Sequence, residues 1–176
     1  MQIFHLRHNE IDFRLWDYAL SKSINQFGYA YSWYLNIVSP GWEALITKNY
    51  EYIMPLPVKR KYGIPYIVQP VLTQQLGIFS DSQITKEIIQ QFISAIPYYS
   101  YEINLNDCNA GQTEIIERTN YVLPLHKSYE ELVGEYSKNT VRNIHRAEKT
   151  GLFVDEEVGK DEFVSFYFSI EKNYTN

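Results

Sequence analysis

Four basic residues near the end of the chain have the spacing of one helix face. Lys138, Arg142, Arg146 and Lys149 follow one another at intervals of 4, 4 and 3 residues. At about 100° per residue, these positions fall within an arc of roughly 80° on an α-helix. Arginine grips phosphate or carboxylate through a planar fork of N–H donors, and lysine adds a point charge. The face therefore predicts contact with an anion, and a solvated surface is the competing interpretation.

Local signals predict the helices that would position this face. Ser128 and Glu131 have the spacing of a capping box, which starts a helix. Ser137 provides a second N-cap, and Gly151 provides a C′ residue that can adopt a left-handed conformation. The side opposite the basic face is the one expected to be buried, and it carries Thr140, Ile144 and Ala147. From Ser137 to Gly151, only Glu148 is available to pair with the cations.

A second candidate site is the glutamine-rich segment that includes Gln69, Gln74 and Gln75. Neutral amides beside short strands can recognise the edge of a peptide or a nucleotide, and Gly77 permits close approach of the backbone. Amides that form buried hydrogen bonds where strands cross explain the same residues equally well. Both interpretations stay open at this point.

Several classes of site are excluded or disfavoured by spacing. No two of the eight glycines are two residues apart, so the chain has no G-x-G turn of the P-loop, dinucleotide or kinase type. His5 and His8 fall on opposite faces of a predicted strand, which favours surface or packing histidines over a shared metal. Cys108 has no feature that brings a base to it and is interpreted as an inert thiol. We expect no metal and no tightly bound cofactor.

Composition limits the protein class further. The 176 residues carry a net charge of −5, which argues against a protein that binds nucleic acid over its whole surface and leaves room for a local basic patch. The single cysteine favours a reducing compartment. No run approaches the ~18 apolar residues of a membrane span. We therefore expect a soluble, cytoplasmic protein.

The order of strand and helix signals predicts the fold class. Sixteen tyrosines and nine phenylalanines favour sheet and half-buried surfaces. Residues 59–63 form a predicted hairpin turn, and 98–106 has the clearest alternation of a half-buried strand. Other strands are expected at 1–7, 42–47, 52–58, 66–69, 76–79 and 152–155, with a strand pair within 114–125. Helices are expected at 12–23, from 81 or 82 to 95, after 128, after 137 and at 161–174. We predict an α/β (α+β) fold with a mostly antiparallel sheet flanked by helices.

The last predicted helix has an aromatic face formed by Phe163, Phe166, Tyr167 and Ile170. An apolar face of this size needs a cover. It packs back on the same domain, belongs to a longer architecture, or forms a homodimer.

The order of two long segments resembles a known family. Residues 54–80 read MPLPVKRKYGIPYIVQPVLTQQLGIFS, and residues 128–154 read SYEELVGEYSKNTVRNIHRAEKTGLFV, with a helix and a Tyr-rich strand between them. The most specific element runs from Tyr136 to Gly151. This order resembles the N-terminal lobe of the two-lobed bacterial acyltransferases of the FemAB-like group, which are related to the GNAT N-acetyltransferase fold. The resemblance covers most of the chain.

The resemblance implies a GNAT-like lobe over 1–151, followed at 152–176 by a strand and helix that begin a second lobe or pack back on the first. It implies transfer of an acyl or aminoacyl group, from acyl-CoA or aminoacyl-tRNA, to a small-molecule or peptide amine. The substrate-binding candidates are Lys138, Arg142, Asn143, Arg146, Lys149, Gln69, Gln74 and Gln75. The alternative is a non-catalytic interaction or RNA-binding module that uses the basic face, with tRNA as the partner.

The sequence departs from the family pattern in one respect. GNAT enzymes hold a pyrophosphate with a Q/R-x-x-G-x-G/A loop, whereas residues 74–79 supply the glutamine and a single glycine. We therefore expect the lobe to be incomplete alone. No catalytic residue is assigned. Glu102 is considered as a general base, with a solvated carboxylate as the competing interpretation.

Overall fold

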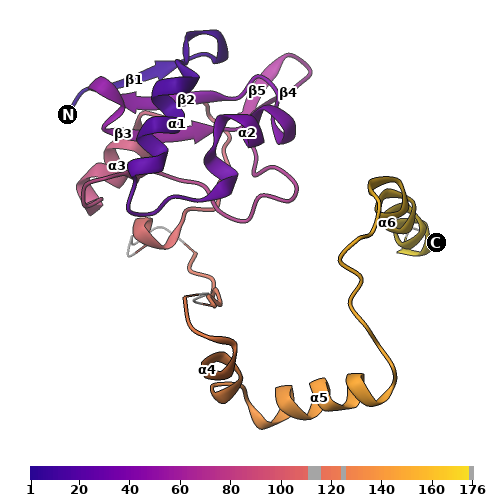
Figure 1. Cartoon of the computed structure of the whole chain (residues 1–176). Coiled ribbons are helices and arrows are strands. Elements are labelled where there is room, and N and C mark those ends of the chain that lie inside the picture. The colour runs from indigo at the N-terminus through magenta and orange to yellow at the C-terminus, as the bar shows by residue number, and fades with distance from the viewer. Residues whose placement is uncertain (111–115, 124–125, 175–176) are drawn as a thin grey trace. The chain divides into compact units, whose positions relative to one another are not determined.

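The computed structural model describes residues 1–110, 116–123 and 126–174, with side chains up to residue 170. The chain divides into unit 1, Met1–Thr119, and unit 2, Asn120–Asn176 (Figure 1). This division lies before the basic helix, whereas the boundary predicted from the sequence lies after it, at Gly151.

Unit 1 is built on a four-stranded antiparallel sheet. Its strands are β1 (Ile3–Leu6), β2 (Glu43–Thr47), β3 (Tyr52–Leu56) and β6 (Phe79–Ser80), in the order β1-β2-β3-β6. β2 lies between β1 and β3, and all five of its residues are buried. The predicted mixed α and β class with an antiparallel sheet is confirmed.

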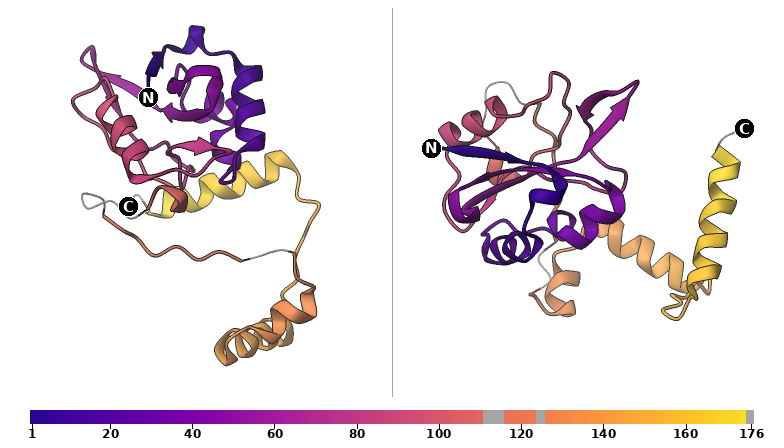
Figure 2. Two further views of the ribbon diagram at one scale, coloured as in Figure 1. Left: turned by 90° about the vertical axis from the view of Figure 1, so that its left-hand side faces the viewer. Right: turned by 90° about the horizontal axis from the view of Figure 1, so that it is seen from above.

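Helices cover both faces of this sheet, as Figure 2 shows. Helices α1 (Phe13–Lys22) and α2 (Ser32–Val38) lie on one face, and α3 (Lys86–Ser94) lies on the other. Alternate residues of β2 and β3 point to opposite faces. The α1 and α2 side of the core contains Trp16, Leu20, Leu35, Trp42, Ala44, Ile46 and Ile53. The α3 side contains Leu45, Met54, Leu56, Ile67, Ile89 and Phe92.

Local signals predicted several boundaries correctly. The Asp12 side chain accepts hydrogen bonds from the backbone N–H groups of Arg14 (3.0 Å) and Leu15 (3.1 Å), and it caps α1 as predicted. The 59–63 hairpin is confirmed by β4 (Val58–Lys61) and β5 (Ile64–Ile67). Tyr62 and Gly63 join these strands with φ values of +53° and +81°, as a type I′ turn requires.

Four short 3-10 helices complete unit 1 within its described residues. They are η1 (His8–Glu10), η2 (Gly28–Ala30), η3 (Lys48–Tyr50) and η4 (Asp107–Asn109).

The prediction of a strand at 98–106 is wrong. This segment makes only two isolated parallel bridges, Ile67 to Tyr101 and Leu76 to Leu105. Tyr99, which the alternation places on the buried side, is fully exposed. The alternation is correct as a pattern, but no continuous partner strand lies beside it. Ladder hydrogen bonds therefore cannot propagate from one residue to the next.

Other boundaries also differ from the predictions. Helix α3 is capped by Thr85, whose hydroxyl accepts the Ile88 N–H, rather than by Asp81 or Ser82. The predicted strand at 152–155 is absent. Residues 116–123 form no strand either, and the remaining part of the predicted 114–125 pair lies outside the described residues.

Unit 2 contains helices α4 (Tyr129–Gly134), α5 (Lys138–Lys149) and α6 (Lys160–Tyr174). The Ser128 hydroxyl accepts the Glu131 N–H at 3.3 Å, and the Glu131 carboxylate accepts the Ser128 N–H at 2.8 Å, so the capping box is confirmed. Ser137 caps α5 through the Thr140 N–H at 3.1 Å. Gly151, with φ +74°, ends α5 as predicted. No helix in the described parts of the chain is both long and apolar enough to span a bilayer.

Candidate functional site

The basic face of α5, formed by Lys138, Arg142, Arg146 and Lys149, is exposed along the whole helix. An open hollow of about 470 Å³ lies among the side chains of Lys138, Val141, Arg142, His145, Arg146 and Lys149. Asn139 positions one of the cations, because its Oδ1 accepts a hydrogen bond from an Arg142 guanidinium nitrogen at 2.7 Å. The sequence-predicted cations are therefore brought together on one surface.

No carboxylate neutralises this face among the residues that the structure describes. In the described residues, the contacts between basic side chains and carboxylates join Lys127 to Glu135 and His5 to Glu43. Glu148, the acid expected to pair with the cations, makes none. Four uncompensated positive charges within one helix length produce a local positive potential on a chain with a net charge of −5.

Asn143 does not belong to the basic face. It lies about 140° around the helix from Lys138, outside the arc of the cations. Val141, Ile144 and Ala147 are the half-buried residues of α5. Asn143 is therefore not part of the candidate anion-binding surface, which the four cations define.

The glutamine candidates belong to unit 1, and two of them, Gln69 and Gln74, form hydrogen bonds with other residues of that unit. The Gln69 amide donates to the Thr73 carbonyl at 2.9 Å and accepts the Asn104 N–H at 3.0 Å. The backbone carbonyl of Gln74 accepts from the Asn104 side chain at 3.2 Å. Gln75 is half-buried. Both ends of the Gln69 amide thus connect stretches of the fold.

Buried asparagines, rather than the glutamines, surround Gly77. Asn109 accepts the Ile78 N–H at 2.7 Å, and Asn25 and Asn106 donate to carbonyls of the same stretch. This arrangement is the one expected for amides at a strand crossing. It favours a structural role for this part of the chain.

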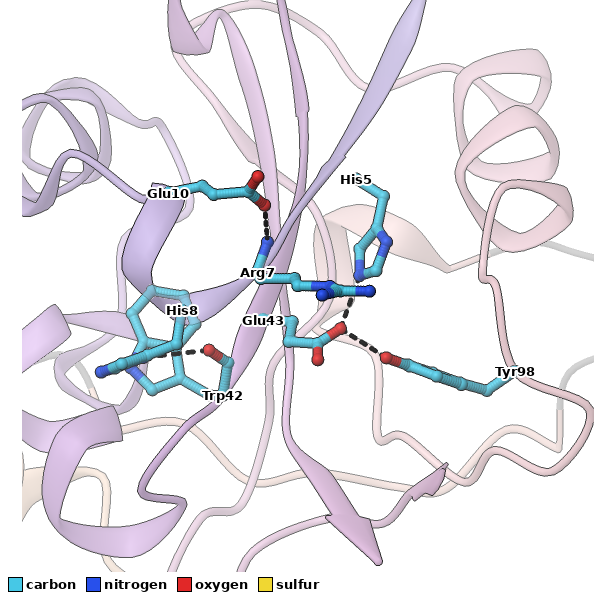
Figure 3. A network of polar contacts seen from close by, with 7 residues as sticks. All are labelled: His5, Arg7, His8, Glu10, Trp42, Glu43 and Tyr98. Carbon is cyan, nitrogen blue, oxygen red and sulfur yellow. Dashed lines mark hydrogen bonds and ion pairs between the residues drawn. The ribbon is translucent and has the colours of Figure 1, made fainter. Parts of the chain in front are cut away.

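A polar network that the sequence did not reveal lies on the α3 face of the sheet (Figure 3). The Glu43 Oε2 atom lies 2.5 Å from the His5 Nε2 atom, and it accepts the Tyr98 hydroxyl at 2.5 Å. His5 stands opposite Leu45 in the β1–β2 register, and Glu43 is two residues from Leu45 along β2. The two side chains therefore share one face of the sheet.

Glu43 is only 6% exposed, and its Oε2 atom makes both contacts, with His5 and with Tyr98. Oε1 accepts no hydrogen bond from another described residue. Burial, followed by the hydrogen bond to Glu43 and the charge of Glu43, raises the pKa of Tyr98 to about 12, although Arg60 and Arg7 act in the opposite direction. The phenol therefore stays protonated at neutral pH and acts as a donor.

Neighbouring contacts in Figure 3 fix the backbone around the network. The Arg7 N–H donates to the Glu10 carboxylate at 2.7 Å. The His8 Nδ1 atom lies 3.1 Å from the Trp42 carbonyl oxygen. His8 is thus a packing histidine and His5 is an exposed one, as predicted, although His5 also contacts Glu43.

One signal could have identified this network. Glu43 is the only charged residue in the predicted strand 42–47, whose other residues are apolar except for Thr47. A charge in such a strand is buried unless the strand lies at an edge of the sheet. A buried charge needs hydrogen-bonding or charged partners. Its partners, His5 and Tyr98, lie 38 and 55 residues away, and no local pattern connects them.

The other titratable candidates lie apart from this network. Glu102 is exposed, which agrees with a solvated carboxylate. Cys108 is exposed on η4, where partial burial of its thiol and the charge of Asp107 raise its pKa. A raised pKa leaves little thiolate at neutral pH, which agrees with the interpretation of Cys108 as an inert thiol. Within the described residues no cluster of His, Cys, Asp and Glu could hold a metal.

The raised pKa of Tyr98 gives a testable dependence of stability on pH. The phenol loses its proton near pH 10 in the unfolded chain and near pH 12 in the folded one. Its contribution to the free energy of unfolding is therefore complete below pH 10 and is lost by about pH 12. The shift corresponds to at most about 2.7 kcal/mol, and with discounting for solvent screening we expect about 1 kcal/mol. Urea unfolding of the wild type and of Tyr98→Phe should show their difference in free energy of unfolding change by this amount over that range. A constant difference would contradict the assignment.

No family model matches the chain, and comparison with curated proteins and with solved structures finds no match either.

Proposed function

We propose that this chain is the N-terminal lobe of an acyltransferase similar to the FemAB-like enzymes, which passes an acyl or aminoacyl group from a carrier to an amine. The observation that carries the proposal is the unneutralised basic face of α5. Acyl groups are carried on thioesters of CoA or on tRNA, and both carriers are polyanions. The order of sequence segments and a helix-flanked antiparallel sheet support the same assignment.

The shape of the basic face favours tRNA over CoA as the carrier. From Lys138 to Lys149 the helix rises about 16 Å, which extends over several backbone phosphates. The hollow on this face is open to solvent, and the chain has no glycine turn that would enclose a pyrophosphate. The lobe alone should therefore bind tRNA in a salt-dependent manner and bind acyl-CoA weakly.

Removing two arginines tests this assignment. With Arg142→Ala and Arg146→Ala together, the slope of log K for tRNA against log salt should fall by roughly 1.5 to 2 units, because two phosphate contacts no longer release counterions. The measurement is a binding titration of the full chain at several salt concentrations.

A matched variant controls for total charge. Lys59→Ala with Arg60→Ala removes two exposed cations from β4 in unit 1 and should leave the slope unchanged. An equal loss in both variants would mean that only net charge matters. Binding that does not respond to salt would exclude tRNA, and tight stoichiometric binding of acyl-CoA would show that the carrier was assigned wrongly.

The alternative is a non-catalytic interaction module, and one observation favours it. The predicted aromatic face of α6 is exposed at Phe163, Phe166, Tyr167 and Ile170. Exposed apolar faces of this kind occur at protein interfaces. A homodimer detected by light scattering, together with absence of salt-dependent tRNA binding, would favour this module over the acyltransferase.

A further inference from the structure

A carboxylate as buried as Glu43 is poorly explained by stability alone. Desolvating an ion costs several kcal/mol, and apolar replacements of buried ion pairs are often equally stable. In addition, a single oxygen of Glu43, Oε2, contacts both Tyr98 and His5. The arrangement instead resembles a carboxylate that orients an imidazole.

The proton positions follow from the chemistry of the partners. An ionised carboxylate can only accept hydrogen bonds, so the Nε2 atom of His5 must carry the hydrogen. In the neutral ring, Nδ1 is then left with its lone pair. Nδ1 makes no hydrogen bond to another described residue, and the His5 side chain is 30% exposed. A proton acceptor with a fixed tautomer is therefore presented to solvent.

A hollow of about 570 Å³ lies between the start of β1 and helix α3. Its lining residues are Met1, Ile3, Glu87, Gln90, Gln91, Ser94 and Ala95. Ile3 is two residues from His5 on the same face of β1, and Ala95 is three residues from Tyr98. The hollow and the His5–Glu43–Tyr98 network are therefore on the same face of the sheet. A carboxylate, two amides and a hydroxyl in the lining suit a polar ligand that carries an amine.

We propose that His5 is the proton acceptor for the amine that receives the acyl group, with Glu43 and Tyr98 as positioning residues. This role rests on the proposed acyl transfer. The amine nitrogen forms a bond with the acyl carbon, and its proton passes to Nδ1 of His5. The bond from the acyl carbon to the oxygen or sulfur of the carrier breaks. The released carrier then takes the proton from His5, so that no oxidant or reductant is needed.

Diethyl pyrocarbonate, which acylates unprotonated imidazole, tests His5 without any carrier. The full chain is treated at about pH 8, where an ordinary imidazole is mostly neutral. Modification of each histidine is followed by mass spectrometry. We expect the rate at His5 to fall by about twofold or more in Glu43→Gln, because the ring is no longer held as the Nε2–H tautomer that leaves Nδ1 unprotonated. His145, which is exposed on α5, is the internal control and should not change.

A second readout separates orientation from a merely structural role. Nitrogen NMR of the imidazoles should show His5 as the Nε2–H tautomer in the wild type and as a mixture in Glu43→Gln. Tyr98→Phe keeps the carboxylate and should give an intermediate rate at His5, and it serves as the test if Glu43→Gln does not fold. Equal reactivity of His5 in the wild type and in the folded variants would overturn the proposal.

The two proposals can fail separately. If the α5 variants leave tRNA binding unchanged while the reactivity of His5 still depends on Glu43, the carrier assignment is wrong. The assignment of His5 as the proton acceptor is then retained. If tRNA binding depends on α5 and His5 reacts like His145 throughout, the proton acceptor is wrong and the carrier assignment stands.

Discussion

Replacing Trp16 with alanine is expected to destabilise unit 1 by about 3–5 kcal/mol, the range for truncating a large buried aromatic side chain. Trp16 is 0% exposed, and its ring centroid lies 4.8 Å from that of Trp42. Its indole N–H donates to the Ala30 carbonyl at 2.8 Å. The substitution therefore leaves a cavity between α1 and the sheet and also removes the partner of a buried carbonyl.

Trp33 provides the matched control for this measurement. It lies on α2 of the same unit, has the same side chain and is 59% exposed. Trp33→Ala should change the free energy of unfolding by less than about 1 kcal/mol, as surface substitutions usually do. Urea unfolding followed by far-UV circular dichroism measures both variants. Similar losses for the two tryptophans would contradict the core described for unit 1.

Helix ends were predicted well because their signals are local. Asp12, Ser128 and Ser137 each cap a helix through N–H groups two or three residues away, and the hydroxyl or carboxylate at that spacing is visible in the sequence. The four cations of α5 share a face for the same reason, since helical periodicity alone determines it.

Strand predictions failed where pairing depended on distant parts of the chain. Residues 98–106 alternate like a strand, yet Tyr101 and Leu105 each find only an isolated bridge. A strand exists only when a neighbour continues beside it, and alternation within one segment carries no information about that neighbour. The absent strand at 152–155 has the same explanation.

The network around Glu43 could not be predicted, because burial of this carboxylate depends on three separate segments. β1 contributes His5, β2 contributes Glu43, and the stretch after α3 contributes Tyr98. The sequence shows that a charge interrupts an apolar strand, but it does not show which residues satisfy that charge. The candidate anion-binding face was therefore predictable, and the candidate proton acceptor was not.

Replacing Gly77 with alanine is expected to cost unit 1 roughly 3–5 kcal/mol, the sum of backbone strain and a broken buried hydrogen bond. Gly77 has φ +102°, which L side chains rarely adopt. A Cβ atom there would lie 2.3 Å from the Asn109 Oδ1 atom. That oxygen is not free to move, because it accepts the Ile78 N–H at 2.7 Å and Asn109 is completely buried.

Gly28→Ala separates this effect from the general consequences of replacing glycine. Gly28 lies in the same unit and does not have a positive φ, and no described atom comes within 4 Å of the place that an alanine Cβ would take. Its substitution should change the free energy of unfolding by less than about 1 kcal/mol. If Gly77→Ala changed the free energy of unfolding equally little, Asn109 would have to move aside without losing its hydrogen bond from the Ile78 N–H. In that case the asparagines around residues 76–78 would not be the rigid structural amides that exclude this stretch from ligand binding.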